Sequence, residues 1–251
     1  MATSFANLKK RRTTDLEKLQ SEVDKINKPQ NNFNRDDDRF WKAELDKSGS
    51  GYAVIRFLPA LDDDKTAFVR VFNHGFQGPG GWYIENSLTT IGQKDPLSEY
   101  NSTLWNSGIE ANKEIARKQK RRLTYFSNIY VVEDKANPQN EGKVFLFRFG
   151  KKIFDKISSM SNPEFEDEAE VNVFNLWDGA NFKLKIRKVD GFSNYDKSEF
   201  MTHGPLFEDE SEMERVFGEQ HDLEEFVDPK SFKTYDDLKA RLDVVLGNIE
   251  T

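Results

Sequence analysis

The chain has 251 residues, a formal net charge of −7 and no cysteine. This length is enough for one large domain or two small ones with a sizeable hydrophobic core. The lack of cysteine excludes a disulfide framework, a thiol nucleophile and a thiolate metal site, and it is typical of proteins from a reducing cytoplasm.

The charged residues are segregated along the chain. Residues Lys113 to Lys152 contain eleven Lys and Arg against four Asp and Glu, whereas Glu199 to Asp228 contain eleven Asp and Glu against one Arg. Binding to a charged polymer depends on the local field, so the acidic total does not exclude an anionic ligand. With neither a signal peptide nor an apolar run of roughly 18 residues, the sequence predicts a soluble cytoplasmic protein.

The N-terminal region is predicted to be a basic arm followed by one amphipathic helix. The arm covers Met1 to Arg12, and the helix starts at Thr13 or Thr14 and ends near Lys28, with apolar residues at three- and four-residue spacing. Its narrow apolar face is compatible with docking on its own core or on a neighbouring molecule. A polar linker is expected to follow over residues 30–38.

The rest of the chain favours a mainly β fold with helices. Alternating or apolar runs predict strands, and two segments joined by "KANPQNEG" predict a hairpin. The expected strands cover 51–60, 67–76, 80–87, 123–134, 143–150, 171–176 and 181–192, and the expected helical regions cover 96–120, 150–160 and 235–249. Short strands with irregular insertions favour a small barrel of the OB type. Without regular βα alternation, a Rossmann-type fold is not expected.

Basic residues lie beside aromatic residues at three places. In "NFKLKIRKV" the side chains of Lys183 and Lys185 alternate with apolar ones, and Phe192 and Tyr195 follow on a loop. Such a pattern binds single strands, because cations follow the phosphates and rings stack on unpaired bases. An ordinary amphipathic strand with a solvated face explains the alternation equally well.

The second and third places carry isolated arginines and a basic triplet. Arg148 follows Phe147 in an apolar strand, and Arg56 stands in "AVIRFLP", so each needs either an acidic partner or an anionic ligand. The triplet Lys120 to Arg122 precedes Tyr125, and a similar basic-and-hydroxyl pentad lies at Lys10 to Thr14. A solvated surface run is the alternative for each triplet taken alone.

No catalytic or metal-binding pattern is legible. The three histidines, His74, His203 and His221, lack ligand spacing, and "GFQGPGGW" lacks the ending of a phosphate-binding loop and is expected to be a hairpin turn. The aspartate triplets at 36–38 and 62–64 are expected to be solvated loops, although a Mg²⁺-dependent nuclease using them is an alternative. The sequence therefore predicts neither an enzyme nor a metal site.

Several blocks in one order resemble a known family. The blocks "AVIRFLP", "NHGF", "GWYIE", "EGKVF", "RFGKKI", "GANF" and "GFSNYD" are similar to the single-stranded DNA-binding, helix-destabilising proteins of T-even bacteriophages, the product of gene thirty-two. The resemblance implies an arm over 1–28 for cooperative self-association, and a core over 29–251 with an OB fold and an inserted subdomain at about 70–118. It implies a role in phage DNA replication, recombination and repair, in the cytoplasm of the infected bacterial host.

The resemblance also implies positions for the contacts. Together with the basic patterns above, it predicts that nucleic acid is bound by Arg56, Tyr100, Trp105, Lys120, Arg121, Arg122, Tyr125, Phe147, Arg148, Lys183, Lys185, Phe192 and Tyr195. Self-association is predicted to use Lys10, Arg11, Arg12, Thr13 and Thr14. An OB-type RNA-binding translational regulator and a purely structural phage protein are the remaining alternatives.

The family's structural zinc is not expected here. The resemblance implies one histidine and three cysteines as ligands, and the matching positions are His74, Ser87, Asp95 and Ser98. Without thiolates a zinc site of that type cannot form. Hydrogen bonds and apolar contacts of Trp82, Ile84 and Leu97 are expected to replace it, with no cofactor. The acidic tail through which the family recruits phage replication and recombination proteins is not present in this sequence.

Overall fold

The computed structural model describes residues 37–165 and 168–248. The chain divides into two units, Met1–Arg35 and Asp36–Thr251, and the described residues belong to the second. The predicted basic arm, its helix and the boundary after residue 28 lie outside the described residues. Among the helices that are described, none is long and apolar enough to cross a membrane.

In the described residues, nine strands form one sheet. They are β1 (Phe40–Trp41), β2 (Gly51–Phe57), β3 (Phe68–Gly78), β4 (Gly81–Asn86), β5 (Arg122–Glu133), β6 (Val144–Phe149), β7 (Asn181–Val189), β8 (Phe192–Asn194) and β9 (Glu199–Phe200). The main path runs β1-β6-β5-β2-β7-β8, while β3 joins β5 to β4 and β9 pairs with β7. Only the β1–β6 pairing is parallel. The long antiparallel ladders confirm a mainly β architecture.

Five α-helices and four 3₁₀ turns of the described part of the chain accompany the sheet. They are α3 (Pro96–Asn106), α4 (Glu110–Lys118), α5 (Lys151–Ser161), α6 (Glu210–Gly218), α7 (Tyr235–Leu246), η1 (Leu88–Ile91), η2 (Pro138–Asn140), η3 (Glu224–Phe226) and η4 (Pro229–Ser231). Side-chain caps fix several starts: Asp95 accepts from the Ser98 amide before α3, and Thr234 accepts from the Asp237 amide before α7. Helix α7 ends at Gly247, whose φ of 76° suits a residue without Cβ.

One predicted strand is absent from the described residues, and one helix was not predicted. The expected strand at 171–176 is a series of turns, because the side chain of Asn172 accepts from the Phe174 amide and that of Asn175 accepts from the Trp177 amide. These local bonds compete with a strand ladder even though Val173 is buried. Helix α6 lies in the acidic segment, where no helix was predicted. The turn expected in "GFQGPGGW" is confirmed, since Gly78 pairs with Gly81 across it.

The main core lies on one face of the strands around β5. Strand β2 contributes Ala53, Ile55 and Phe57, β5 contributes Tyr125, Ile129 and Val131, β6 contributes Phe147 and Phe149, β7 contributes Phe182, Leu184 and Ile186, and α5 contributes Ile153 and Ile157. These residues recur at every second position of each strand, as expected for a sheet with one buried face.

A second core packs the β3–β4 hairpin against helices. It contains Phe76, Tyr83, Leu88, Leu97, Phe232, Leu238, Leu242 and Val245. The turn of the hairpin approaches α7 so closely that the Gly80 amide donates to the Val245 carbonyl at 2.9 Å. A Cβ on Gly80 would lie 1.9 Å from the Val244 carbonyl oxygen, so this position requires glycine.

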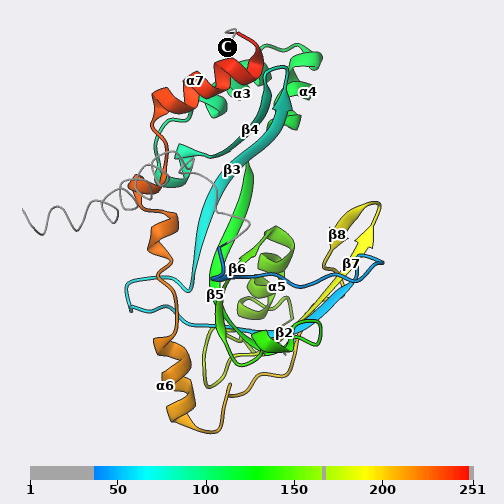
Figure 1. Ribbon diagram of the computed structural model, residues 1–251, viewed down its shortest axis with the longest axis vertical. Helices are drawn as coiled ribbons and strands as arrows, with labels where there is room; N and C mark the ends of the chain where they lie inside the picture. The colour runs from blue at the N-terminus through cyan, green and yellow to red at the C-terminus, as the bar shows by residue number, and fades with distance from the viewer. Residues whose placement is uncertain (1–36, 166–167, 249–251) are drawn as a thin grey trace, which may run out of the picture. The chain divides into compact units, whose positions relative to one another are not determined.

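The two sides of the β3–β5 ladder have different neighbours. The segment from α6 through η3 and η4 runs along one side, while α5 and the β7–β8 hairpin lie on the other (Figure 1). On the first side Phe226 of η3 stacks on Phe126 with ring centroids 4.7 Å apart. The acidic segment therefore covers one face of the ladder and leaves the opposite face to α5.

Candidate nucleic-acid interface

The register of β3 and β5 decides which side chains share a face. Arg70 lies opposite Tyr125, and Phe72 lies opposite Leu123. Because opposed residues and every second residue point the same way, Phe68, Arg70, Phe72, Leu123 and Tyr125 occupy one face of the ladder. We call these five residues the α5 face, since α5 packs against its Tyr125 end.

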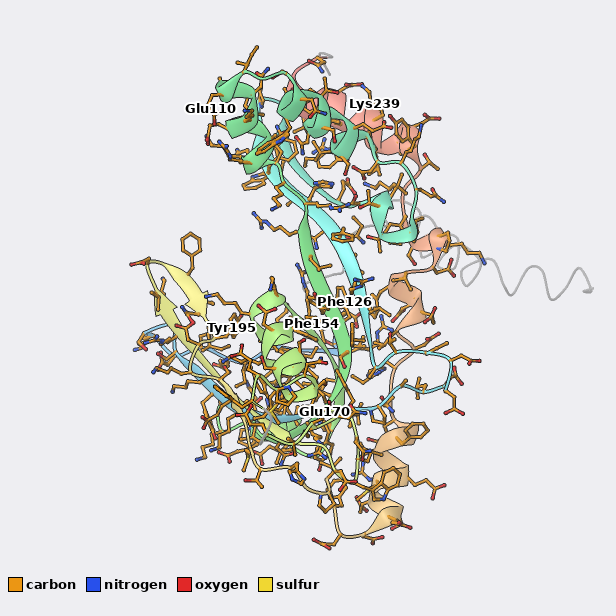
Figure 2. All side chains as sticks on the ribbon, turned by 180° about the vertical axis from the view of Figure 1, so that it is seen from behind. Glu110, Phe126, Phe154, Glu170, Tyr195 and Lys239 are labelled. Atoms are coloured by element: carbon orange, nitrogen blue, oxygen red, sulfur yellow. The ribbon has the colours of Figure 1, made fainter. Side chains whose placement is uncertain are left out.

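Aromatic rings gather at the α5 end of this face (Figure 2). Phe154 of α5 stacks on Tyr125 at 4.2 Å with an angle of 7° between the rings, and Phe68 lies 5.3 Å from Phe154. Phe174, from the turns after α5, stacks on Phe68 at 6.0 Å. Tyr125 is buried, whereas Phe68, Phe154 and Phe174 are half-buried and retain accessible ring surface.

Cations border these rings. Arg70 is exposed, and burial raises the pKa of the Tyr125 hydroxyl while the positive charges of Arg70 and Lys151 oppose that rise. The Lys151 ammonium is bonded to Asp155 at 2.6 Å, and the charge of that carboxylate adds to the rise of the Tyr125 pKa. The sequence did not predict Phe68, Arg70, Phe154 or Phe174, because they come from separate elements that only the fold unites.

Farther along the α5 face, the basic triplet is divided between two faces. Arg121 lies over the ring of Phe72 at 4.1 Å and donates to the Thr89 hydroxyl at 2.7 Å. Arg122 is on the opposite face, where it reaches the carbonyl of Gly75 at 3.4 Å. The expectation that Lys120, Arg121 and Arg122 line one cleft is therefore corrected, because consecutive side chains alternate at the start of β5.

A pocket of about 690 Å³ lies where the α5 face approaches α3 and α4. Its lining includes His74, Asn101, Trp105, Arg117, Lys120 and Arg121. Trp105 is 48 % exposed, and the Arg117 guanidinium lies 5.3 Å from its ring. Glu110 and Glu114 neutralise Arg117, whereas no carboxylate of the described residues pairs with Lys120. Three predicted contacts, Trp105, Lys120 and Arg121, thus meet at one cavity.

Tyr100 does not line this pocket. It lies on α3, but its ring packs against the second core instead of lining the pocket. The helical turn between Tyr100 and Trp105 explains the difference, because residues five apart point in different directions around an α-helix. Tyr100 and Trp105, both predicted to contact nucleic acid, therefore do not lie in the same pocket.

The β7–β8 hairpin carries a second group of predicted residues. Phe192 follows a tight turn formed by Asp190 (φ 51°) and Gly191 (φ 84°), and it is 78 % exposed. Tyr195 is half-buried against the main core, and burial raises the pKa of its hydroxyl. Tyr195 lies on the side of the sheet that also carries α5 (Figure 2).

The two lysines of β7 point away from the main core, as the alternation predicted. Lys183 lies 3.5 Å from Glu199, so its charge is partly neutralised. The Lys185 ammonium lies 5.9 Å from the ring of Tyr52. They face the outer surface of the β2–β7 pair, so they do not join the ring cluster around Phe154.

Arg56 and Phe147 are enclosed. Arg56 is 1 % exposed, and its guanidinium donates to the carbonyls of Asn175 at 2.8 Å and Gly204 at 2.9 Å. Burial lowers its pKa to about 10. Phe147 is buried against Trp41 in the main core. These positions contradict direct ligand contact by either residue: loops cover the outer face of β2 above Arg56, and Phe147 points inward.

Arg148 has a different environment. Its side chain is exposed, yet surrounding protein lowers its pKa by desolvation, and no carboxylate of the described residues pairs with it. Arg148 lies opposite Phe126 in the β5–β6 register, so it shares the face of Phe126 and is not on the α5 face. It remains an accessible cation on β6.

The four positions that match the relatives' zinc ligands do come together. The His74 Nε2 atom lies 3.4 Å from Asp95 Oδ1, which also accepts from the Ser98 amide at 2.9 Å. Asp95 Oδ2 accepts from the Leu88 amide at 3.1 Å. Burial alone would raise the pKa of Asp95, but the bonds from His74 and Ser98 outweigh it and lower the pKa to about 2.

This donor set does not fit zinc. One imidazole, one carboxylate with both oxygens already bonded and two hydroxyls differ from the thiolate and imidazole donors of structural sites. Within the described residues, no three His, Asp or Glu side chains are grouped to hold a metal ion. Leu97 is buried as expected, but Trp82 and Ile84 are 55 % and 59 % exposed, so the expectation that they pack here is wrong.

Comparisons with known proteins identify relatives of this chain. A family model described as "gp32 DNA binding protein like" matches residues 49–246. The single-stranded DNA-binding protein of Enterobacteria phage T2 is 42 % identical over 236 residues, covering 91 % of this chain and 77 % of the relative. The protein of the same name from Enterobacteria phage T4 is 43 % identical over 222 residues, covering 86 % and 72 %. The chain therefore belongs to the family of gp32-like DNA-binding proteins.

Proposed function

We propose that this protein binds single-stranded DNA without sequence preference and without catalysis. One observation supports this most directly: the α5 face joins half-buried rings to cations over a continuous stretch of the β3–β5 ladder. Cations attract the phosphate backbone, and rings stack on bases that lack a pairing partner. The relatives from phages T2 and T4 are named for the same ligand.

The two ends of the α5 face define the path of the bound DNA strand. At one end Phe68 and Phe154 offer ring surface beside Arg70, and at the other end Trp105 and Lys120 line the pocket. Arg121, held over Phe72, lies between them. A strand bound along this line meets alternating stacking and phosphate-binding groups. The acidic segment covers the opposite face of the ladder, so its charge does not repel a strand on this face.

Two finer features belong to this proposal. The bent sheet is an OB-like barrel core, supported by the way β2, β5, β6 and β7 all face the main core. Molecules bind next to one another along the strand through the basic residues Lys10 to Thr14, and the protein acts in DNA replication, recombination and repair inside the infected bacterial cell. The family membership supports both features.

The salt dependence of binding is a quantitative consequence. For single strands the logarithm of the affinity falls by about 0.7 per phosphate contacted for each logarithmic unit of salt. With roughly six phosphates, a fourfold rise in salt weakens binding by about 300-fold. Stacking adds roughly 1–3 kcal/mol per base and does not depend on salt in this way.

The test is a titration of intrinsic fluorescence with oligo(dT), a duplex of equal length and oligo(U), each at two salt concentrations. We expect salt-sensitive quenching by oligo(dT) and little response to the duplex. Equal affinity for oligo(U) would make RNA the ligand instead, since backbone tracking and stacking do not read the 2′-OH. Cleavage of labelled oligo(dT) in Mg²⁺ would contradict a non-enzymatic role and implicate the exposed aspartates 62–64.

A further inference from the structure

Strand β4 presents two large apolar side chains to solvent. Trp82 is 55 % exposed and Ile84 is 59 % exposed, while Tyr83 between them is buried in the second core. Among the described strands β4 pairs with β3 alone, so within this part of the chain it is an edge of the sheet. Edge strands of monomeric proteins are usually protected by charged side chains, bulges or a covering element. Here two apolar side chains stand at the edge instead.

The main-chain groups of Ile84 point away from β3. Gly78 pairs with Gly81 across a two-residue turn, and such a closing pair exchanges both of its hydrogen bonds. Alternate pairs then bond in the same way, so Tyr83 bonds to β3 while Trp82 and Ile84 direct their amides and carbonyls outward. The Trp82 carbonyl accepts from Arg241 at 2.8 Å, as this direction requires. In the described part of the chain, nothing beyond β4 bonds to the amide or carbonyl of Ile84.

Two arginines border this edge. Arg241 of α7 reaches the Trp82 carbonyl, and Arg122 of β5 reaches the carbonyl of Gly75, the residue opposite Ile84. Since Gly75 has no side chain, Arg122 lies directly beside Ile84. No carboxylate of the described residues forms an ion pair with either guanidinium. The nearest acidic residue in β4, Glu85, points to the other face and is bonded to Lys233 at 2.7 Å.

We propose that β4 is a docking edge for an extended acidic segment of a partner protein. The segment adds as a further strand, with its main chain bonded to the amide and carbonyl of Ile84. Its apolar side chains pack on Trp82 and Ile84 at every second position. Its carboxylates meet Arg122 and Arg241, whose positive charges lack acidic partners and select an acidic segment.

This edge and the α5 face are on opposite sides of the same ladder. Arg122 belongs to the face of Val69 and Phe126, whereas the α5 face carries Arg70 and Tyr125. A peptide on β4 and a DNA strand on the α5 face therefore do not compete. The docking edge does not depend on the proposed DNA-binding function.

The test uses the whole chain and an eight-residue peptide that alternates aspartate with leucine or valine. Calorimetric titration is done with the free protein and with protein saturated with oligo(dT). We expect equal binding in both, and slower hydrogen exchange at the Ile84 amide when peptide is present. Loss of binding in the presence of oligo(dT) would overturn the proposal, because the peptide would then occupy the DNA-binding face. A peptide with lysine in place of aspartate is expected not to bind, and equal binding of the two would also overturn it.

Substitutions separate the main-chain contact from the side-chain contact. Ile84→Pro removes an outward-pointing amide and no hydrogen bond to β3, and an edge strand tolerates proline at such a position. This substitution should weaken peptide binding about tenfold. Ile84→Val is the matched control and should bind like the unchanged protein. Trp82→Ala tests the apolar contact if the proline variant unfolds. The docking edge would be refuted if Trp82→Ala and a folded Ile84→Pro both bound the peptide as tightly as the unchanged protein. It would also be refuted if either variant bound oligo(dT) more weakly.

Discussion

Asp95 should contribute stability that depends on pH in a defined direction. Its carboxylate is buried and accepts bonds from the amides of Leu88 and Ser98, and His74 lies beside it. Its pKa falls from the ordinary 3.8 to about 2 in the folded protein. Such a shift corresponds to about 2 kcal/mol of unfolding free energy. Because the folded pKa is the lower one, the contribution is complete above pH 4 and is lost as pH falls toward 2.

The perturbation is Asp95→Asn, which keeps the shape of the side chain but removes its charge and one acceptor. Urea unfolding of both proteins at pH 7, 5, 4 and 3 gives the difference in unfolding free energy. We expect a loss of at least about 2 kcal/mol at pH 7 that shrinks at pH 3, where the carboxylate of the unfolded chain is protonated. Asp63→Asn, in an exposed loop, is the matched control and should have little effect. A difference that stays constant from pH 7 to pH 3 would refute this reasoning.

Four further predictions follow from the site and the core. Trp105→Ala should weaken oligo(dT) binding by roughly 1–3 kcal/mol, the value of one stacked base, in a fluorescence titration. Trp177 is similarly exposed, and Trp177→Ala should leave the affinity unchanged. Arg121→Gln should reduce the salt slope by about 0.7, the value for one phosphate, and an unchanged slope would remove Arg121 from the path. Arg56→Ala should lower the unfolding free energy by at least about 2 kcal/mol, because the buried carbonyls lose their hydrogen-bond donor. If stability were unchanged and the affinity for oligo(dT) were lost, Arg56 would be a DNA contact after all. Elemental analysis of the purified protein should find no stoichiometric zinc, and one zinc per chain would contradict the hydrogen-bonded arrangement around His74.

The local pattern of the sequence predicted most strands and their buried faces. The alternation in "KVFLFRF" placed Phe145, Phe147 and Phe149 on one side, and all three face the main core. The alternation in "NFKLKI" likewise placed Phe182, Leu184 and Ile186 inward. Such predictions succeed because the side-chain period of a strand is fixed by backbone geometry alone. The strand expected at 171–176 failed because asparagine side chains bonded to nearby amides.

The candidate site could be predicted only in part. Trp105, Lys120 and Arg121 were each predicted to contact nucleic acid, and the structure brings them to one pocket. Arg56 illustrates what a pattern cannot decide: the sequence required an acidic partner or an anionic ligand, whereas the structure buries it against the carbonyls of Asn175 and Gly204, more than a hundred residues away. The rings of Phe68, Phe154 and Phe174 were not expected, because each comes from a different element.

The sequence by itself determined the family blocks, the periodicity of the strands and the absence of thiolate ligands, because these depend on residue types and their spacing. Only the tertiary structure decided which face of the β3–β5 ladder is covered by the acidic segment, how the triplet at Lys120 to Arg122 divides, and how His74 and Asp95 meet. Those outcomes depend on strand register and on long-range packing. The alternation of each strand divides its side chains between two faces, but which element covers each face is decided by packing between segments far apart in the sequence.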